Sequence, residues 1–325
     1  MFRYIMRRLI FSIPVLVVSS ILVFVVIRLN GDFLSSTLAN PRASAAAIAK
    51  ARDALGLNKS GYQQYISWIT HFVRLDWGRS LLTNQPVAKD IRDALWNSIV
   101  LGVVGTAFAL LIGVGIGIYS ALRQYSFFDQ VATGAAFFGI SIPQFWFGLM
   151  LQIFFGIYLV RWFHLSDPIF YITGMFKAGT TGFHLVDRIR HIVLPAMVLS
   201  VQILAVYSRY MRASMLEVLQ ADFMRTARSK GLPERRVIFR HAVRNALIPI
   251  TTQLAIDVGT IAGGLIITEQ VFQWPGMGKF FITAFNNGDY PQVLPWVMIT
   301  VASVILFNLV ADIAYAFLDP RIRYA

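Results

Sequence analysis

Residues Met215–Pro249 read MLEVLQADFMRTARSKGLPERRVIFRHAVRNALIP, the most basic run in a chain that is otherwise strongly apolar. Apolar runs long enough to cross a bilayer lie on both sides of it. A charged segment between two membrane spans is suited to be a surface on which another protein acts. The acidic residues of this stretch are Glu217, Asp222 and Glu234. The basic residues are more numerous: Arg225, Arg228, Lys230, Arg235, Arg236, Arg240 and Arg244.

Two helices are expected in this stretch. The first is expected from Leu216 to Lys230, which holds good helix formers and no internal glycine or proline. Gly231 and Pro233 then end it, because glycine accepts the left-handed conformation and proline cannot continue a helix. Pro233 can be the first residue of a second helix, with Glu234 near the positive end of its dipole.

The composition predicts a membrane protein. Of the 325 residues 57% are hydrophobic and only 14% are charged, and the mean hydropathy is +0.62. Soluble domains carry about 25% charged residues. The net charge of +13 is attributed to membrane-flanking loops rather than to nucleic-acid binding. The chain has no cysteine, which excludes disulfides and thiolate metal sites, and its five histidines show no metal-ligand spacing.

Six transmembrane helices are expected, and both termini are then on the same side. Basic residues in the short loops place that side in the cytoplasm. The first apolar run has about 21 residues, whereas the apolar core of a signal peptide usually has about 7–15 residues. We therefore interpret this run as an uncleaved span. The expected spans are Leu9–Leu29, Asn97–Leu122, Val131–Val160, Ile192–Tyr210, Ile248–Phe272 and Leu294–Phe317.

The expected domains follow from these spans. Residues 1–29 form the N-terminal transmembrane helix, and residues 30–95 form an extracytoplasmic domain that includes an amphipathic helix over Ala43–Leu57. Residues 96–325 form a core of five spans, with a cytoplasmic loop over 213–247. The outer segment is too long for a simple connection, and its aromatic residues can bury a small core.

The segment ADFMRTARSKG, residues Ala221–Gly231, resembles the cytoplasmic coupling loop of an ABC importer permease. The general loop has Glu-Ala-Ala, three residues and then Gly; here Arg225-Thr226-Ala227 stands three residues before Gly231. The exchange of Glu for Arg, and a late proline at Pro249, are features that resemble the dipeptide, oligopeptide and nickel permease family, B-type subunits. Further similar segments are Leu55-Gly56-Leu57, Asp76-Trp77-Gly78-Arg79-Ser80, Ser141-Ile142-Pro143 and Glu269–Gly278.

The resemblance implies a type I ABC importer permease that carries di- or oligopeptides by alternating access. It implies a bacterial or archaeal cytoplasmic membrane, a second homologous permease subunit, two cytoplasmic ATPase subunits and an extracytoplasmic solute-binding protein. The chain itself would be no enzyme and hold no cofactor, since ATP and Mg²⁺ would bind the partner subunits. The residues implied to contact the ATPase are Asp222, Phe223, Arg225, Thr226, Ala227, Lys230 and Gly231.

The translocation pathway is expected to include Ser141, Pro143, Gln253 and Asp257. A carboxylate within a span costs about 2.5–3.5 kcal/mol on insertion scales, so Asp257 is expected to face water or a partner. Pro143 frees backbone groups, which is tolerated beside protein or water, although a simple packing kink is the alternative. Arg209 and Arg212, at the inner end of the fourth span, are expected to snorkel.

Other functions stay open at this point. A stand-alone secondary transporter or channel could use six spans, but no paired discontinuous spans in matching halves are evident. Related importers carry nickel chelates, haem-like compounds or oligosaccharides. No phosphate-binding loop, H-E-x-x-H or G-x-S-x-G motif occurs. The basic loop could also be a solvated surface attracted to anionic lipid, at roughly 1 kcal/mol per Lys or Arg.

Overall fold

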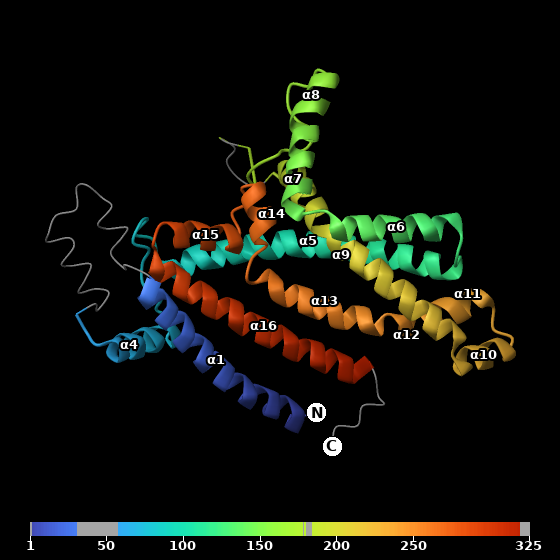
Figure 1. The fold of residues 1–325 in the computed structure, drawn as a ribbon, viewed down its shortest axis with the longest axis horizontal. Coiled ribbons are helices and arrows are strands. Elements are labelled where there is room, and N and C mark those ends of the chain that lie inside the picture. The colour runs from blue at the N-terminus through green and yellow to red at the C-terminus, as the bar shows by residue number, and fades with distance from the viewer. Residues whose placement is uncertain (1, 31–57, 178, 180–183, 319–325) are drawn as a thin grey trace. The chain divides into compact units, whose positions relative to one another are not determined.

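The computed structural model describes residues 2–30, 58–177, 179 and 184–318 (Figure 1). The expected helix over Ala43–Leu57 lies outside these residues. Apart from one antiparallel bridge between Arg79 and Pro86, the regular structure of the described chain is helical. The helices are α1 (Phe2–Asn30), α4 (Gly61–Val73), α5 (Val87–Leu122), α6 (Phe127–Ser141), α7 (Gln144–Ile153), η1 (Phe154–Tyr158), α8 (Leu159–Trp162), α9 (Leu185–Gln220), α10 (Asp222–Ser229), α11 (Glu234–Arg236), η2 (Val237–Ala242), α12 (Val243–Ala246), α13 (Ile248–Ile261), α14 (Ile266–Val271), α15 (Met277–Asn286) and α16 (Tyr290–Leu318).

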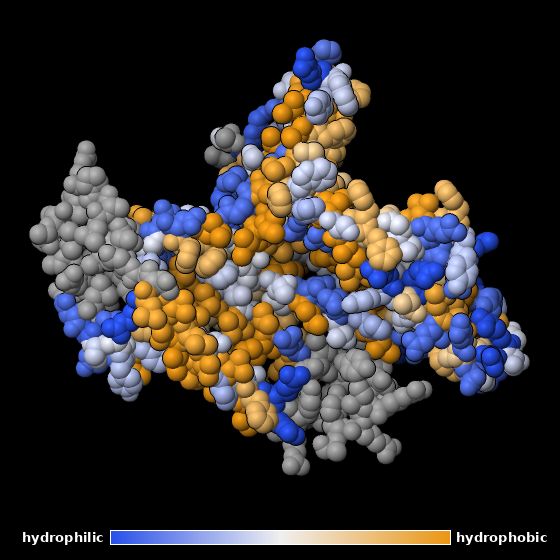
Figure 2. Space-filling view, in the orientation of Figure 1, coloured by the Kyte–Doolittle hydropathy of each residue, from blue (hydrophilic) through white to orange (hydrophobic). Residues whose placement is uncertain are grey.

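Five of the described helices are long and apolar enough to cross a bilayer. Hydrophobic residues gather over α1 on the face shown in Figure 2. Its side chains Ile10, Phe11 and Val18 are each more than half exposed. Apolar surface of this extent is stable in lipid rather than in water. The five segments are Met6–Leu29, Val87–Leu122, Gln144–Trp162, Leu185–Gln220 and Tyr290–Val310.

Two of the six expected spans are not continuous helices. The expected span over 131–160 is divided at Ile142-Pro143 into α6 and the α7–η1–α8 segment, because Pro143 cannot donate the backbone hydrogen bond that would continue α6. The expected span over 248–272 is divided into α13 and α14. Gly264 lies between these two with φ +88°, a conformation that ends a helix.

The fourth expected span is longer than the sequence indicated. It was expected over residues 192–210, whereas α9 runs over 36 residues from Leu185 to Gln220. At 1.5 Å per residue this is about 54 Å, well beyond the roughly 30 Å of the bilayer core. The last turn of α9 leads directly, through Ala221, to α10.

Contacts divide the chain into two compact units, each described by itself. The first consists of Met1–Ile99, Gly259–Ile266 and Pro275–Leu306, and the second of Val100–Val258, Ile267–Trp274 and Phe307–Ala325.

An aromatic ladder forms part of the core of the first unit. The α4 helix begins with a capping box in which the Ser60 hydroxyl accepts from the Gln63 backbone N–H. Trp68 stacks on Phe24 of α1 with ring centroids 5.9 Å apart, and Phe72 stacks on Trp77 at 5.8 Å. Trp68, Phe72 and Trp77 are therefore packing anchors within this unit.

A buried carboxylate holds the turn that follows this ladder. Asp289 is fully buried and accepts hydrogen bonds from the Ser80 hydroxyl at 2.5 Å and the Leu81 backbone N–H at 3.1 Å. These bonds fix the 78–86 turn against the connection between α15 and α16. The region after Gln273 largely forms the helix α15.

In the second unit, glycines bring α5 close to α9. A Cβ on Gly113 would lie 2.9 Å from the Leu204 carbonyl oxygen, and one on Gly117 would lie 2.6 Å from that of Ser208. Small residues permit this close helix approach in membranes. Gly115, between these two, has no neighbouring atom within 4 Å of such a Cβ.

Candidate functional site: the 213–247 loop and the polar groups of the second unit

The α10 helix is shorter than the helix expected from Leu216 to Lys230. The α9 helix continues to Gln220, and Ala221 adopts an extended conformation with ψ 148° before α10 begins at Asp222. Asp222 lies in the first turn of α10, where a negative charge is favourable. The break allows α10 to leave the axis of α9 and fold back on it.

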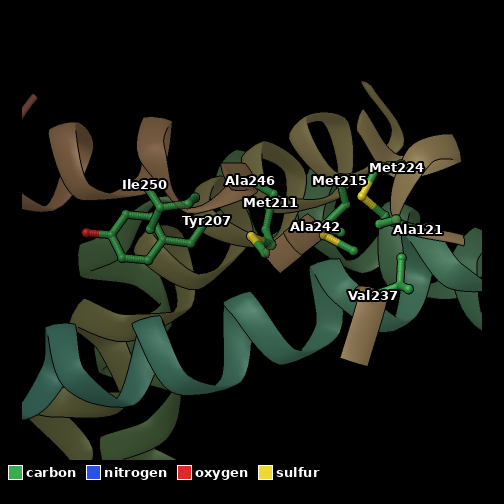
Figure 3. Close-up of a cluster of buried hydrophobic side chains, with 10 residues drawn as sticks. Ala121, Tyr207, Met211, Met215, Met224, Val237, Ala242, Ala246 and Ile250 are labelled. Carbon is green, nitrogen blue, oxygen red and sulfur yellow. The ribbon is translucent and has the colours of Figure 1, made fainter. Parts of the chain in front are cut away.

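One face of α10 is buried in the core of the second unit. Met224 is completely buried and Ala227, three residues on, is nearly so. They pack in a cluster whose other members lie on α5, α9, η2, α12 and α13. Figure 3 shows these members: Ala121, Tyr207, Met211, Met215, Val237, Ala242, Ala246 and Ile250. Burying a methionine side chain contributes about 1.5–3 kcal/mol.

The other face of α10 is open. The side chain of Asp222 is 98% exposed, that of Arg225 is 78% exposed, and Phe223 is 41% exposed. Thr226 and Lys230 are exposed as well. Of the seven residues expected to contact an ATPase, the structure therefore brings six to one open surface, and Ala227 alone faces inward.

The end of α10 follows the expected pattern. Gly231 has φ +71° and its backbone N–H donates to the Arg228 carbonyl at 2.9 Å. Left-handed glycine after the last turn is a common helix terminator. Arg228 then pairs with Glu234 at 3.0 Å across the turn. Pro233 is not the first helical residue as expected; its ψ of 139° makes it the cap, and the helix begins at Glu234.

The second helix of the loop contains a π-helical segment that its sequence did not indicate. Between Val237 and Ala242 the turn widens, so that these two side chains, five residues apart, both reach the buried cluster. Ala246 follows four residues later on the same side. In a regular α-helix position 241 rather than 242 would lie above Val237.

A buried ion pair fixes the inner end of α9 to α6. Arg212 donates from Nε to Asp129 Oδ1 at 2.6 Å and from Nη2 to Oδ2 at 2.7 Å. Asp129 is 2% exposed and also accepts from the Tyr125 backbone N–H at 2.9 Å. The hydrogen bond from Arg212 lowers the pKa of Asp129 below its ordinary 3.8. The expectation that Arg212 snorkels is thus wrong, because a carboxylate 83 residues away in sequence binds its guanidinium.

Arg209 also has a protein partner. Its guanidinium lies 4.5 Å from the centroid of the Phe137 ring on α6, a cation–π contact. The side chain is exposed, so its snorkelling stays a prediction. No sequence signal links Phe137 to Arg209, since the contact depends on how α6 packs along α9.

Two of the four expected pathway residues are brought together. Gln253 and Asp257 are one turn apart on α13, and the Gln253 amide donates to Asp257 Oδ1 at 2.8 Å. The hydroxyl of Tyr207, which is completely buried on α9, donates to Oδ2 at 2.7 Å. Asp257 is only partly buried, and sequence reasoning missed its orienting partner Tyr207.

The other two expected pathway residues mark the break between α6 and α7. The exposed Ser141 donates back to the Phe137 carbonyl at 2.8 Å, within its own helix. Pro143 caps α7 and is exposed. Gln202 of α9 donates to the Ile142 carbonyl at 3.2 Å, so protein satisfies a polar group at the break.

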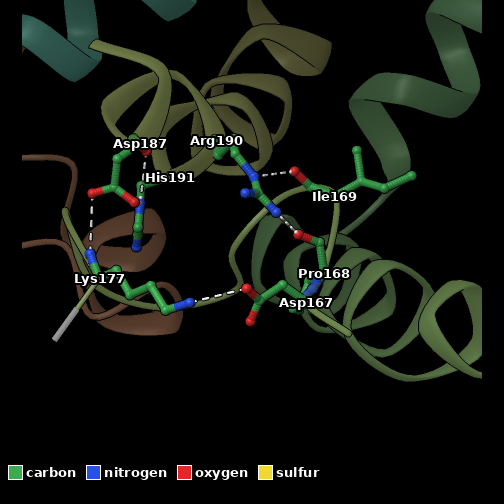
Figure 4. A network of polar contacts seen from close by, with 7 residues as sticks. All are labelled: Asp167, Pro168, Ile169, Lys177, Asp187, Arg190 and His191. Atoms are coloured by element: carbon green, nitrogen blue, oxygen red, sulfur yellow. Dashed lines mark hydrogen bonds and ion pairs between the residues drawn. The ribbon is translucent and has the colours of Figure 1, made fainter. Parts of the chain in front are cut away.

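The segment over 167–177, which follows α8, is held by a polar network with residues of α9 (Figure 4). Arg190 donates to the carbonyls of Pro168 and Ile169. The Lys177 amine binds Asp167 at 2.9 Å, which raises the pKa of Lys177, and the Lys177 backbone N–H donates to Asp187 at 3.1 Å. These bonds order the 167–177 segment. Within the described residues, no group of three side chains that could hold a metal ion occurs.

Comparison with known proteins agrees with this architecture. Residues 113–324 match the family described as the binding-protein-dependent transport system inner membrane component, and residues 1–101 match its N-terminal component. The chain belongs to this family of transport permeases, which confirms the resemblance seen in the sequence.

Three full-length relatives illustrate the match. The chain is 39% identical over 325 residues to the oligopeptide transport system permease protein AppB of Bacillus subtilis, covering 100% of both chains. It is 36% identical to the dipeptide transport system permease protein DppB of Escherichia coli K12, over 100% of this chain and 99% of that one. It is 34% identical to the glutathione transport system permease protein GsiC of Salmonella typhi, over 100% of both.

Proposed function

We propose that this chain is one of two permease subunits of an ATP-driven importer for di- or oligopeptides. In this proposal six spans cross the cytoplasmic membrane with both termini inside, α13 and α14 together forming the fifth. A second homologous permease, two ATPase subunits and a solute-binding protein complete the importer, and nucleotide and Mg²⁺ bind the ATPases. The peptide substrate is inferred from the relatives, two of which are named for oligopeptide or dipeptide transport.

The observation that carries the proposal is the two-sided α10 helix. Its exposed face, with Phe223 and Arg225, is available to a partner, while Met224 on the opposite face is locked into the buried cluster. Protein interiors are close-packed, so a displacement of α10 is transmitted rather than absorbed. The first recipients are Met211 and Met215 on α9, and α9 extends through the expected membrane layer.

The pathway is proposed to include the Gln253–Asp257 pair and the α6–α7 break at Ser141 and Pro143. α9 touches both places, through Tyr207 at Asp257 and through Gln202 at the Ile142 carbonyl. A movement of α9 driven from α10 would therefore reach both groups. This connection supports alternating access. The helix that is displaced by the ATPase, α9, would also change the positions of the polar groups along the pathway.

The test uses the complex of both permeases and both ATPases in proteoliposomes that contain the solute-binding protein and a labelled peptide. Phe223→Ala removes an exposed ring from the proposed interface, so the fold should remain intact. We expect ATPase binding or peptide uptake to fall at least tenfold. Phe127→Ala removes a ring that is 83% exposed on α6, also on the expected cytoplasmic side, and serves as the matched control. Equal uptake by both variants would contradict the proposal.

A further inference from the structure

A groove on the second helix of the loop has no role in the proposed coupling. It is lined by Pro233, Arg235, Arg236, Phe239 and Arg240. All five residues are exposed, and Phe239 is 58% exposed despite its apolar ring. Figure 2 shows hydrophilic residues gathered around this end of the second unit. The groove thus combines three cations with an open aromatic surface.

The three arginines of the groove are not neutralised by the loop's own acids. Glu234, the adjacent carboxylate, is engaged by Arg228 at 3.0 Å, and Asp222 lies 3.8 Å from Arg225. Within the described residues Arg235, Arg236 and Arg240 form no ion pair with a carboxylate. A guanidinium presents a planar fork of donors that matches phosphate oxygens.

The π-helical turn is what keeps this surface outward. It places Val237 and Ala242 in the buried cluster, and the additional residue of the wide turn lies on the outer side, where Phe239 and Arg240 are exposed. Single π-turns are uncommon and frequently occur at functional sites. The same helix continues through α12 and reaches α13 at Ile248, eight residues after Arg240, or about 12 Å along a helix.

We propose that this groove binds the phosphate headgroup of an anionic phospholipid of the membrane in which the chain is embedded. The inference rests on the proposed cytoplasmic position of the loop. Arginines within about two turns of a span reach the headgroup layer, and basic clusters immediately cytoplasmic of a span bind anionic lipid. The Phe239 ring supplies apolar surface for the lipid's glycerol and upper acyl region. An acidic surface of the ATPase is the competing occupant.

The test compares two doubly neutralised variants of the full importer complex. Arg235→Gln with Arg240→Gln removes two groove charges. Arg123→Gln with Arg244→Gln removes two exposed charges that do not line the groove. Complexes are purified from membranes that contain phosphatidylglycerol, and retained lipid is measured by native mass spectrometry. Peptide uptake is measured in liposomes of phosphatidylcholine alone and of equal parts phosphatidylcholine and phosphatidylglycerol.

We expect the wild type and the control pair to retain phosphatidylglycerol and to transport faster when it is present. The groove pair should lose this lipid, with apparent affinity for it weaker by about fivefold per arginine, and its uptake should no longer respond. Added inorganic phosphate should not replace the lipid. Equal lipid loss by both pairs, or no response of the wild type to phosphatidylglycerol, would overturn the inference.

Loss of the ATPase subunits from the groove pair in pure phosphatidylcholine would also overturn it, by assigning the groove to the ATPase. The proposed function is tested separately, by peptide uptake of the wild-type complex in pure phosphatidylcholine. Uptake there without any effect of phosphatidylglycerol removes only the lipid inference, whereas absence of uptake in both lipids removes the proposed function.

Discussion

Removing either partner of the Asp129–Arg212 pair should destabilise the second unit to different degrees. Arg212→Met leaves the Asp129 carboxylate, whose side chain is 3% exposed, without its guanidinium. Breaking a buried pair in this way costs about 3–5 kcal/mol. Asp129→Asn leaves Arg212, whose side chain is 26% exposed and can regain water. Its cost should therefore be lower, about 1–3 kcal/mol.

Thermal unfolding of the purified importer, followed by tryptophan fluorescence, measures this difference. A loss of 1 kcal/mol lowers Tm by about 2–4 °C for a unit of 150–250 residues, so Arg212→Met should lower it by about 6–20 °C. Because both changes remove the same contact, the double variant should lose less than the sum of the single losses. A larger loss for Asp129→Asn than for Arg212→Met would refute the reasoning.

The pH dependence gives a second signature of the pair. The pKa of Asp129 is lower in the folded protein than its ordinary 3.8, so the pair stabilises fully above that value. The contribution is lost as pH falls through the lowered folded pKa, where the carboxylate becomes protonated. Asp129→Asn should therefore flatten the dependence of Tm on pH below about pH 4. An unchanged acid slope in this variant would show that other groups determine it.

Three further predictions concern the loop and the pathway. Met224→Ala should free α10 from the buried cluster at a cost of about 2–5 kcal/mol, seen as faster hydrogen exchange of the α10 amides, with Phe223→Ala as the control on its exposed face. Gly231→Ala should cost about 1–2 kcal/mol through its positive φ alone, since no atom lies within 4 Å of the new Cβ; an unchanged Tm would argue against the left-handed turn. Gln253→Cys, in a chain without cysteine, should react with a polar thiol reagent in at least one transport state, and inertness in every state would remove it from the pathway.

The apolar runs and the end of α10 could be predicted because they depend on local chemistry. Hydropathy alone locates the spans of α1, α5, α9 and α16, and Gly231 marks the turn because few other residues adopt φ +71° easily. The beginning of α10 at Asp222 is different. Nothing in Leu216–Gln220 forbids the continuous helix that was expected, and the break at Ala221 coincides with the burial of Met224.

The residues that sequence reasoning missed have distant partners. Arg212 binds Asp129, and Tyr207 binds Asp257, across 83 and 50 residues. Neither pairing leaves a spacing signal, because each arises where two packed helices meet. The π-turn over Val237–Ala242 is similar: the i, i+5 spacing of its buried residues is recognisable only when the cluster they enter is known. Asp257 and Gln253 could be paired beforehand, since they are four residues apart on one helix.

Cross-linking shows directly whether the exposed face of α10 contacts the ATPase. Arg225→Cys places a thiol on the exposed face of α10, and Phe127→Cys places one at an exposed position of α6. In each variant the introduced residue is the only cysteine of the chain. Complexes with a photoreactive thiol-attached reagent are irradiated with and without ATP, and cross-linked subunits are identified by mass spectrometry. We expect position 225 to cross-link to the ATPase in a yield that changes with ATP, and position 127 not to cross-link to it. Equal labelling of the ATPase from both positions, or none from position 225, would contradict it.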